Sequence, residues 1–448
     1  MRKKLAGVLS CALMLSAGGQ ISFNRYHENY VYAENRVSDV IEIAQVSDFG
    51  KIQDNVSGHY QLVADIDFST LEDRDLQSNE QGEVYYPITF AGELDGNGHT
   101  VKGVERGLFD SIDAGGKIYD LVIEADFGGS VRMGSEKSEE SIESRMQVKY
   151  TCAGRNQGSI QNCRVDCRIS DIEGVETDCL YVYGLCQENE GIISDSEVHI
   201  EATAIRGDMI GMYVAGICDV NDKTIKNCTA GLQIFENEAE QMYVSGICNR
   251  NAYIAASEDL SKNRSFGTIT DCRTEGQVKS FGQRDIEFGG ISIENDGIIE
   301  KCENGVNCDI ITVCSGGIAA KNSAMLLRSV NHGELTIRGE IEGFDCVMGE
   351  IAGKSDGTMK GCDSDGKVVS VLAEEKQQVV LMPTEQVLYG DVNGDDDITM
   401  EDAILLRRAL AGYSTIEINK DWGDMDQDGE ITSADVVILL QYLAGYCV

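Results

Sequence analysis

Two acidic loops near the end of the sequence hold the residues whose types and spacing could do chemistry. The first runs from Asp391 to Asp402, and the second, which begins 33 residues later, runs from Asp424 to Asp435. Each loop has oxygen-bearing side chains at its positions 1, 3, 5 and 12. Calcium-binding loops supply side-chain oxygens at these positions, and position 7 adds a backbone carbonyl. The pattern therefore predicts two Ca²⁺ sites, one in each loop.

The predicted ligands are all oxygen atoms, as Ca²⁺ requires. The first ion would be bound by Asp391, Asn393, Asp395, Asp397 (through its carbonyl) and Asp402, and the second by Asp424, Asp426, Asp428, Glu430 (through its carbonyl) and Asp435. Because the carboxylates of an empty loop repel one another, binding should fold the segment. Position 6 needs a left-handed backbone, which Gly429 adopts more easily than Asp396, so the second site should bind more tightly.

An apolar helix is expected after each loop, over Ala403–Ala411 and Val436–Ala444, and the two helices should pack through Ile404, Leu405, Val437 and Leu440. Pro383 precedes the first loop, and the residue before a proline avoids helix, so no helix should enter that loop. Two loop–helix repeats of this kind resemble a dockerin, the module that attaches secreted proteins to a cellulosome-type scaffold. The resemblance implies a small all-α domain over 388–448, with Ca²⁺ as its cofactor and a cohesin domain of a scaffoldin as its partner.

The resemblance also implies which residues contact the partner, because these lie around loop positions 10, 11, 17 and 18 in dockerins. The corresponding residues are Met400, Glu401, Arg407 and Arg408 in the first half, and Ser433, Ala434, Leu440 and Gln441 in the second. The two sets differ in charge and polarity. A symmetric, two-way mode of binding is therefore not expected.

The beginning of the chain has the features of a secretory signal peptide. Basic residues at 2–4 precede an apolar run from Leu5 to Leu15, and small residues follow at 16–19. The apolar run is too short to cross a bilayer. We assign 1–33 to the signal peptide, with cleavage near 16–19 or after Ala33 as alternatives. The protein is expected to be extracellular and attached to a cell-surface or cellulosome scaffold.

The composition excludes two classes of partner. The chain has 76 acidic and 37 basic residues, which gives a formal net charge of −39. Nucleic acids and anionic membrane surfaces are bound through clustered lysine and arginine. Neither is expected to be a partner here.

The middle of the chain is a degenerate repeat of the form Gly-Ile-Cys-x-x-Asn-x-Gly-x-Ile-x-x-Cys, found between Cys152 and Val369. Its asparagines at 156, 189 and 221 follow one another in steps of 33 and 32 residues. Such a period indicates a solenoid, and the density of glycine without a helical stripe favours strands. We predict a right-handed parallel β-helix over 34–369, followed by a linker over 370–387 and the helical calcium-binding domain.

Stacked coils should bring equivalent residues into columns. The inward isoleucines should form one column, made of Ile160, Ile193, Ile225, Ile269 and Ile299. The repeat asparagines should adopt the left-handed turn conformation and hydrogen-bond to one another along the stack. Cys186, Cys218 and Cys248 should line up as buried thiols, with disulfides as the alternative, because the sixteen cysteines recur singly and no Cys-x-x-Cys pair occurs.

The repeat resembles the GLUG repeat of bacterial surface and adhesin-like proteins, which implies an adhesin-like or carbohydrate-contacting solenoid. The alternative is a β-helical polysaccharide lyase or glycoside hydrolase that takes part in polysaccharide degradation. An enzyme would need converging carboxylates. Acidic residues flank the repeat asparagine at Glu188, Glu190, Asp219, Asp222, Glu294 and Asp296. No basic residue accompanies them regularly along the sequence, so we interpret them as a solvated edge and assign no catalytic residue, and the enzyme stays the less favoured alternative.

Overall fold

The computed structural model describes most of the repeat region and parts of the C-terminal segment. The described residues are 40–70, 89–104, 107–128, 146–254, 265–279, 286–310, 314–338, 347–371, 380–381, 390–393, 398–412, 418, 420–426 and 429–443. The expected signal peptide and the expected ligands Asp395, Asp397 and Asp428 lie outside these residues. Within the described part, no helix is long and apolar enough to cross a membrane.

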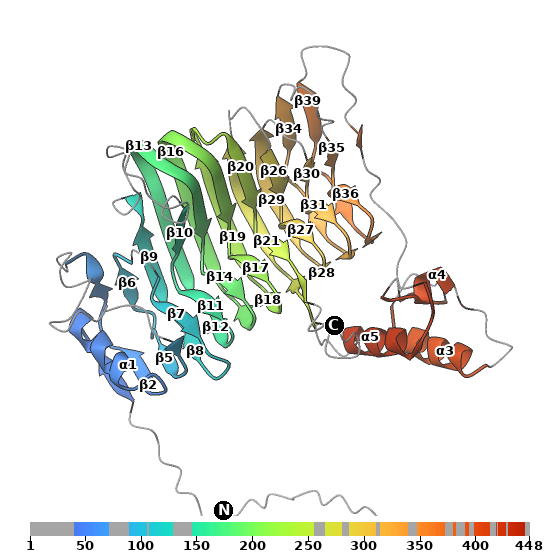
Figure 1. Cartoon of the computed structure of the whole chain (residues 1–448), viewed down its shortest axis with the longest axis horizontal. Helices are drawn as coiled ribbons and strands as arrows, with labels where there is room; N and C mark the ends of the chain where they lie inside the picture. The colour runs from blue at the N-terminus through green and yellow to red at the C-terminus, as the bar shows by residue number, and fades with distance from the viewer. Residues whose placement is uncertain are drawn as a thin grey trace, which may run out of the picture. The chain divides into compact units, whose positions relative to one another are not determined.

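The repeat region is a solenoid of parallel strands in stacked sheets, as predicted (Figure 1). Each coil contributes a short strand to sheet A, longer strands to sheet B and a short strand to sheet C. Sheet A consists of β1 (Ile41–Ile43), β2 (His59–Leu62), β5 (Glu93–Asp95), β8 (Lys117–Tyr119), β12 (Ser159–Gln161), β15 (Ile192–Ser194), β18 (Thr224–Lys226), β24 (Thr268–Thr270), β28 (Ile298–Glu300), β32 (Met325–Leu327) and β37 (Thr358–Lys360).

Sheet C lies on another side of the coils and has one strand for most repeats. It consists of β4 (Thr89–Phe90), β7 (Phe109–Ile112), β11 (Ala153–Asn156), β14 (Cys186–Asn189), β17 (Cys218–Asn221), β21 (Cys248–Asn251), β27 (Ser292–Asn295), β31 (Ala319–Asn322) and β36 (Ala352–Ser355).

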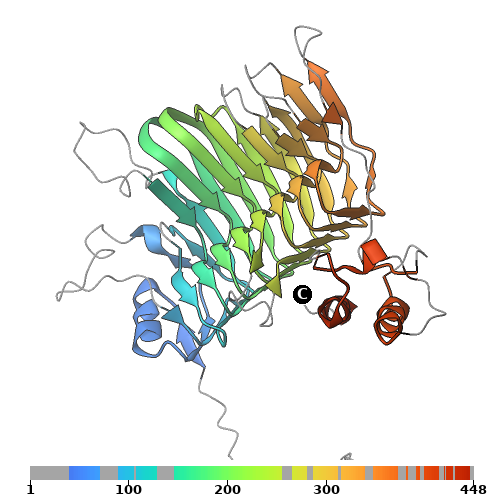
Figure 2. The ribbon, with the colours of Figure 1, turned by 45° about the vertical axis from the view of Figure 1, so that its right-hand side comes forward.

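Sheet B holds the longest strands, which lie side by side along the solenoid (Figure 2). Its strands are β3 (Ile66–Asp67), β6 (Thr100–Lys102), β9 (Val122–Asp126), β10 (Met146–Tyr150), β13 (Arg164–Tyr183), β16 (Glu197–Ala215), β19 (Thr229–Phe235), β20 (Gln241–Ser245), β25 (Arg273–Lys279), β26 (Ile286–Gly289), β29 (Glu303–Ile310), β30 (Cys314–Gly316), β33 (Val330–Asn331), β34 (Leu335–Arg338), β35 (Val347–Gly349), β38 (Asp363–Ser364), β39 (Val368–Val371) and β40 (Val380–Leu381).

A few elements lie outside the three sheets. Near the start of the solenoid are the 3₁₀ turns η1 (Val46–Phe49) and η2 (Phe68–Thr70) and the helix α1 (Gly50–Asp54). The antiparallel pair β22 (Tyr253–Ile254) and β23 (Ser265–Phe266) flanks the polar insert of one repeat. At the far end, β40 pairs with β35 although its residues fall in the segment expected to be a linker.

The predicted isoleucine column is confirmed. Ile160 pairs with Ile193, Ile193 with Ile225, Ile225 with Ile269 and Ile269 with Ile299, and all five side chains are fully buried. Parallel strands in strict register place identical residues over one another. The repeat of the sequence is therefore also the repeat of the core.

Most of the described cysteines lie in two buried columns, as free thiols. Cys186 pairs with Cys218 and Cys218 with Cys248 in sheet C, as predicted. A second column contains both cysteine and serine: the Cys163 N–H donates to Ser196 Oγ at 3.1 Å, and the Cys228 N–H donates to Cys272 Sγ at 3.5 Å. Every cysteine among the described residues is free. Burial raises the pKa of Cys163 and Cys167 to about 12, so these thiols are poor nucleophiles at neutral pH.

The repeat asparagines form the predicted hydrogen-bonded ladder. Each Nδ2 donates to the Oδ1 of the next coil at 2.7 to 2.9 Å, and the series is Asn156, Asn189, Asn221, Asn251, Asn295 and Asn322. Ser355 accepts from the last amide at 3.0 Å. A buried amide must satisfy its donors and acceptor, and an identical neighbour above and below does so.

The expectation that these asparagines adopt the left-handed conformation was wrong. The left-handed residues instead stand one position before the second cysteine column, for example Asn162, Asn227 and Asp271 with φ of 49°, 53° and 53°. There the chain turns from sheet A into sheet B. The corner needs a positive φ, whereas the ladder needs a strand end whose side chain points inward, and one residue cannot meet both requirements.

The C-terminal segment is helical. It contains α3 (Met400–Leu410), the one-turn α4 (Lys420–Gly423) and α5 (Ser433–Leu443). Both long helices begin three residues before the expected starts, since the loop residues just before Ala403 and Val436 already form the first turn. The apolar core of this segment includes Val392, Ala403, Leu406, Met425, Val436, Ile438 and Leu439.

Replacing Ile225 with Asp should destabilise the solenoid by more than about 4 kcal/mol, because the change leaves a cavity and an unpaired charge between coils. Lys226→Asp is the matched control, since its exposed side chain places the same carboxylate outside the core. Thermal unfolding followed by circular dichroism compares the two. Equal midpoints for the two variants would contradict the continuous isoleucine core.

Thiol titration tests the cysteine columns. The native, unreduced chain should react slowly with a thiol reagent, because the thiols are buried. The unfolded, unreduced chain should react at nearly every cysteine. A count of one thiol or none after unfolding would show that the columns are bridged by disulfides.

Candidate metal centre

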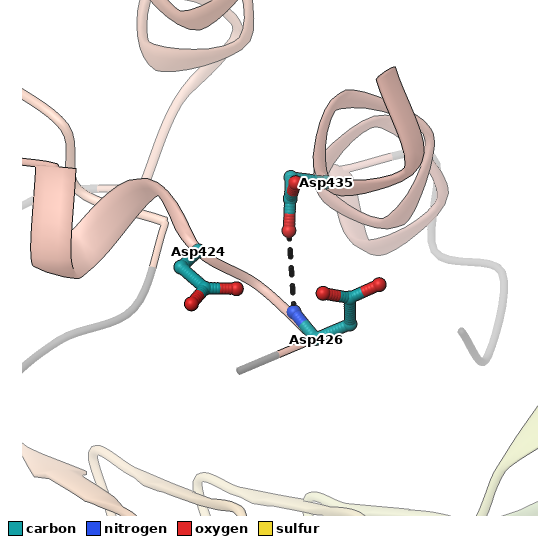
Figure 3. A group of neighbouring side chains, drawn as sticks. All are labelled: Asp424, Asp426 and Asp435. Atoms are coloured by element: carbon teal, nitrogen blue, oxygen red, sulfur yellow. Dashed lines mark hydrogen bonds between the residues drawn. The ribbon is translucent and has the colours of Figure 1, made fainter. Parts of the chain in front are cut away.

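Three predicted ligands of the second loop converge. Carboxylate oxygens of Asp424, Asp426 and Asp435 lie within 4.8 Å of one another (Figure 3). The residues of loop positions 1, 3 and 12 are thus brought to one point. The loop supplies two of them, and the first turn of α5 supplies the third.

Asp435 is held in place by the backbone of its own loop. Its Oδ1 accepts from the Met425 N–H at 2.7 Å and from the Asp426 N–H at 3.3 Å (Figure 3). Its Oδ2 accepts from the Thr432 N–H at 2.7 Å. The Thr432 hydroxyl in turn accepts from the Ala434 N–H at 3.1 Å. This arrangement caps α5 and fixes the carboxylate at the positive end of the helix dipole, which favours a buried anion there.

The turn of the second loop is suited to the tight coil that the ligands require. Gly429 has φ +89°, and its N–H donates to Asp424 Oδ2 at 2.9 Å. A side chain at this position would be strained whatever space surrounds it. Gly429 therefore allows the chain to turn back towards Asp424, as the sequence predicted for position 6.

The first loop repeats this construction where it is described. Asp402 is fully buried, and its Oδ2 accepts from the Thr399 N–H at 2.8 Å. Its Oδ1 accepts from the Asn393 N–H at 3.3 Å. The Thr399 hydroxyl accepts from the Glu401 N–H at 3.1 Å, which completes the cap of α3. Asp391 is also buried, whereas Asn393 is exposed.

The donor set fits Ca²⁺ and no softer metal. The converging ligand atoms are carboxylate oxygens, and the cysteines of the described residues lie in the solenoid. Asp424, Asp426 and Asp435 would hold the ion in the second loop, and Asp391, Asn393 and Asp402 in the first. A bound Ca²⁺ would offset the repulsion among carboxylates that lie this close together.

The two threonines at loop position 9 have a role that the sequence did not define. Thr399 and Thr432 cap the helices and hydrogen-bond the aspartate at position 12. The sequence does contain a signal for this role, because a threonine followed three residues later by an acidic residue is the pattern of a capping box at the start of a helix.

The predicted helix packing was partly wrong. Ile404 and Val437 are 45% and 51% exposed, whereas Leu405 and Leu440 pack against the helical core. The buried aspartate at position 12 fixes the rotation of each helix. Residues one and four positions later, such as Ala403 and Leu406, then face the core, and a residue two positions later faces away.

The expected partner-contacting residues differ in exposure between the two halves. Met400, Glu401, Arg407 and Arg408 are all exposed on α3. On α5, Ser433 and Ala434 are exposed, but Leu440 and Gln441 are half-buried. Ile404 and Val437 add an exposed apolar residue to each helix, at equivalent positions of the two repeats.

The acidic residues of the solenoid are accompanied by basic ones, contrary to the expectation from the sequence. Strand register in sheet C aligns Arg155 with Glu188, and Arg250 with Glu294. Arg155 Nε lies 2.9 Å from Glu190 Oε1, and Lys321 Nζ lies 3.5 Å from Glu294 Oε1. The basic residues were missed because they belong to neighbouring coils rather than to neighbouring positions in the sequence.

Three carboxyl groups of this edge are affected by burial. Burial raises the pKa of Asp219, although Asn249 donates to it at 2.8 Å. Burial also raises the pKa of Asp222, with a further contribution from nearby Glu190, and that of Asp296. The edge therefore carries ion pairs and partly buried carboxyl groups, whereas the sequence had predicted a solvated edge.

Residues 389–444 match the family model for the dockerin type I domain. Type I dockerins bind calcium and dock to the cohesin domains of scaffoldins. No curated protein matches the chain by sequence. Among solved structures, a candidate immunoglobulin A1 protease from Bacteroides ovatus is similar with a TM-score of 0.31 and 14% identity, over 77% of this chain and 80% of that chain.

Calcium binding should be visible in the fluorescence of Trp422, the single tryptophan of the chain. Trp422 lies in α4, two residues before Asp424, and its carbonyl accepts from the Gly390 N–H at 2.6 Å. Ca²⁺ should shift its emission as the loops order, and EDTA should reverse the shift. Asp435→Asn should weaken binding at least about tenfold, or ~1.4 kcal/mol.

The control for this measurement is Asp363→Asn, which removes an exposed carboxylate on β38 in the solenoid. It should titrate like the parent chain. If Asp435→Asn also titrates like the parent, or if Ca²⁺ leaves the emission unchanged, the proposed ligand set is wrong.

Proposed function

We propose that the C-terminal segment, over about 388–448, binds two Ca²⁺ ions and docks the chain to a cohesin domain of a scaffoldin. The observation that carries this proposal is the convergence of Asp424, Asp426 and Asp435 within the matched segment. Calcium supplies positive charge at the start of each helix. The residues of the chain then set the orientation of α3 and α5.

The docking surface would consist of the exposed side chains of α3 and α5. Met400 is 54% exposed, and it shares α3 with exposed Ile404. Exposed apolar residues of this size, surrounded by charged ones, are typical of a protein–protein interface. Arg407 and Arg408 would add charged contacts, which make binding specific and increase its rate of formation.

The two helices would not be interchangeable in this interface. The positions of Arg407 and Arg408 on α3 are taken on α5 by Leu440 and Gln441, which are half-buried. A partner that pairs its own acidic groups with Arg407 and Arg408 would find no basic residue at the equivalent positions of α5. We infer a preferred orientation in which α3 makes most of the contacts.

The solenoid would be the part displayed by this attachment. We propose that the chain is secreted by a signal peptide within 1–33, and that its GLUG-like repeats form an adhesin-like or carbohydrate-contacting surface outside the cell. The regular strand register gives this surface repeated rows of side chains with one spacing between coils. Rows of this kind suit an extended, repetitive ligand such as a plant polysaccharide.

An enzyme that degrades polysaccharide is the second candidate. The observation that favours it is a set of polar side chains on the outer face of β13 and β16, where His199 Nε2 lies 2.9 Å from Glu197 Oε1. Incubation of the full chain with plant polysaccharides would test it. Release of reducing sugar would favour a hydrolase, and release of unsaturated sugar would favour a lyase. If no sugar is released, display remains the proposed function of the solenoid.

Capture by immobilised cohesin domains tests the docking. The full chain should be retained in Ca²⁺ and released by EDTA, and the double change Asp391→Ala, Asp424→Ala should abolish capture. Ile404→Glu should weaken capture more than Val437→Glu, because α3 makes most of the contacts. Val63→Glu, which alters an exposed valine of the solenoid, is the control.

Capture that survives both EDTA and the double change would refute docking through the calcium loops. Equal effects of Ile404→Glu and Val437→Glu would instead refute the preferred orientation and leave the docking itself in place.

A further inference from the structure

The outer face of sheet B carries an open hollow of about 520 Å³. Strand register brings its polar residues together from four successive coils: Asp166 pairs with His199, His199 with Gly231 and Gly231 with Glu275. A parallel row holds Arg168, Glu201 and Gln233. The volume lies within the range of about 300–1,000 Å³ found for ligand sites in proteins.

Two glycines create the depth of this hollow. Gly231 takes the outward position between His199 and Glu275, and a Cβ there would lie 2.5 Å from His199 Nδ1. Gly276 has φ +121°, and a Cβ there would lie 2.0 Å from the Leu232 carbonyl oxygen. Any side chain at 231 would thus fill the space beside the imidazole, and the backbone at 276 requires glycine.

The exposed side chains of the lining are polar and include both donors and acceptors. Arg168 Nε donates to Ser170 Oγ at 2.6 Å and lies 4.0 Å from Glu201 Oε1. The imidazole of His199 is fixed through Nε2 by Glu197, which leaves its Nδ1 over Gly231. Glu201, Gln233 and Glu275 are exposed. The two apolar residues of the lining, Cys167 and Ile200, are buried in the core.

This lining disfavours metal ions, anions and apolar ligands. Within the described residues, the group of acidic, histidine or cysteine ligands close enough to share one metal ion is that of Asp424, not one in this hollow. Carboxylates outnumber the guanidinium of Arg168, and the chain carries a net charge of −39, so an anion would be repelled. No exposed apolar side chain lines the hollow. A neutral, polyhydroxylated ligand is the class that uses both the acceptors and the donors of this lining, whereas an organic cation would use the carboxylates alone.

We propose that this hollow binds a neutral glycan segment. Carboxylates of Asp166, Glu201 and Glu275 would accept hydrogen bonds from sugar hydroxyls, and Arg168 and Gln233 would donate to hydroxyl or ring oxygens. Hydrogen bonds to charged groups are stronger than those between neutral groups. Two adjacent hydroxyls of a sugar ring can donate to the two oxygens of one carboxylate. This inference rests on the proposed display function of the solenoid, because it names the place and the ligand class of that surface.

Affinity electrophoresis of the full chain in Ca²⁺ tests this proposal, with soluble xyloglucan, galactomannan and mixed-linkage β-glucan as neutral probes and polygalacturonate as the anionic one. At least one neutral polysaccharide should retard the chain, and polygalacturonate should not. The double change Glu201→Gln, Glu275→Gln should weaken retention at least about tenfold while keeping the side-chain shapes. Gly231→Leu, which fills the hollow, should abolish it.

The matched control is the double change Glu42→Gln, Asp356→Asn, which also removes two exposed carboxylates but outside the hollow. It should bind like the parent chain. Circular dichroism establishes whether each variant is folded. If Gly231→Leu does not fold, the isosteric double change Glu201→Gln, Glu275→Gln still tests the site.

The proposal is overturned if no neutral polysaccharide retards the chain, if polygalacturonate alone does, or if the glutamine pair binds like the control. Cohesin capture measured on the same samples separates the two ideas. A chain that is captured but does not bind a neutral polysaccharide refutes the glycan site alone. A chain that binds the polysaccharide but is not captured refutes the docking alone.

Discussion

Strict register between parallel coils is the constraint on which the solenoid depends. Each coil hydrogen-bonds to the next through its backbone, so each side chain must pack against the one at the equivalent position of the coils above and below, which is often a copy of itself. Isoleucine, cysteine and asparagine meet this condition inside the coils. Outside them, Tyr181, Tyr213 and Tyr243 stack with ring centroids 4.6 Å apart. One rule therefore governs both the core and the surface.

The C-terminal segment is organised by a different force. Its helices share a small apolar core, and each has in its first turn a buried aspartate that is also an expected calcium ligand. In the second loop, the hydrogen bonds to Asp435 at the start of the helix also hold its carboxylate beside Asp424 and Asp426, the other expected ligands. In the proposed calcium-bound state, metal binding and helix formation would thus be coupled through Asp402 and Asp435, whereas the register of the solenoid comes from backbone hydrogen bonds between its coils.

The sequence predicted the features that depend on spacing alone. The ligand positions of the loops, the column through Ile225 and the ladder through Asn221 all follow from a period that is visible in the residues. Features that depend on local geometry were missed. The left-handed corner at Asn227 and the outward rotation of Ile404 are set by where the backbone turns and by which residue is fixed first, and a repeat pattern does not contain that information.

The groups that could contact a ligand on the solenoid were also beyond sequence analysis. His199, Gly231 and Glu275 come from three coils of unequal length, so their alignment appears only once the coils are stacked. The same is true of Arg250 and Glu294. A solenoid converts distant positions into neighbours, and its surface chemistry is therefore a property of the register.

Hydrogen–deuterium exchange on the full chain, with Ca²⁺ and with EDTA, tests most directly the claim that stacking orders one part and calcium the other. Amides of the solenoid strands should be equally protected in both conditions. Amides of α3 and α5 should be protected in Ca²⁺ and exchange rapidly in EDTA. Equal protection of these helices without the ion, or loss of protection in the strands, would contradict this account.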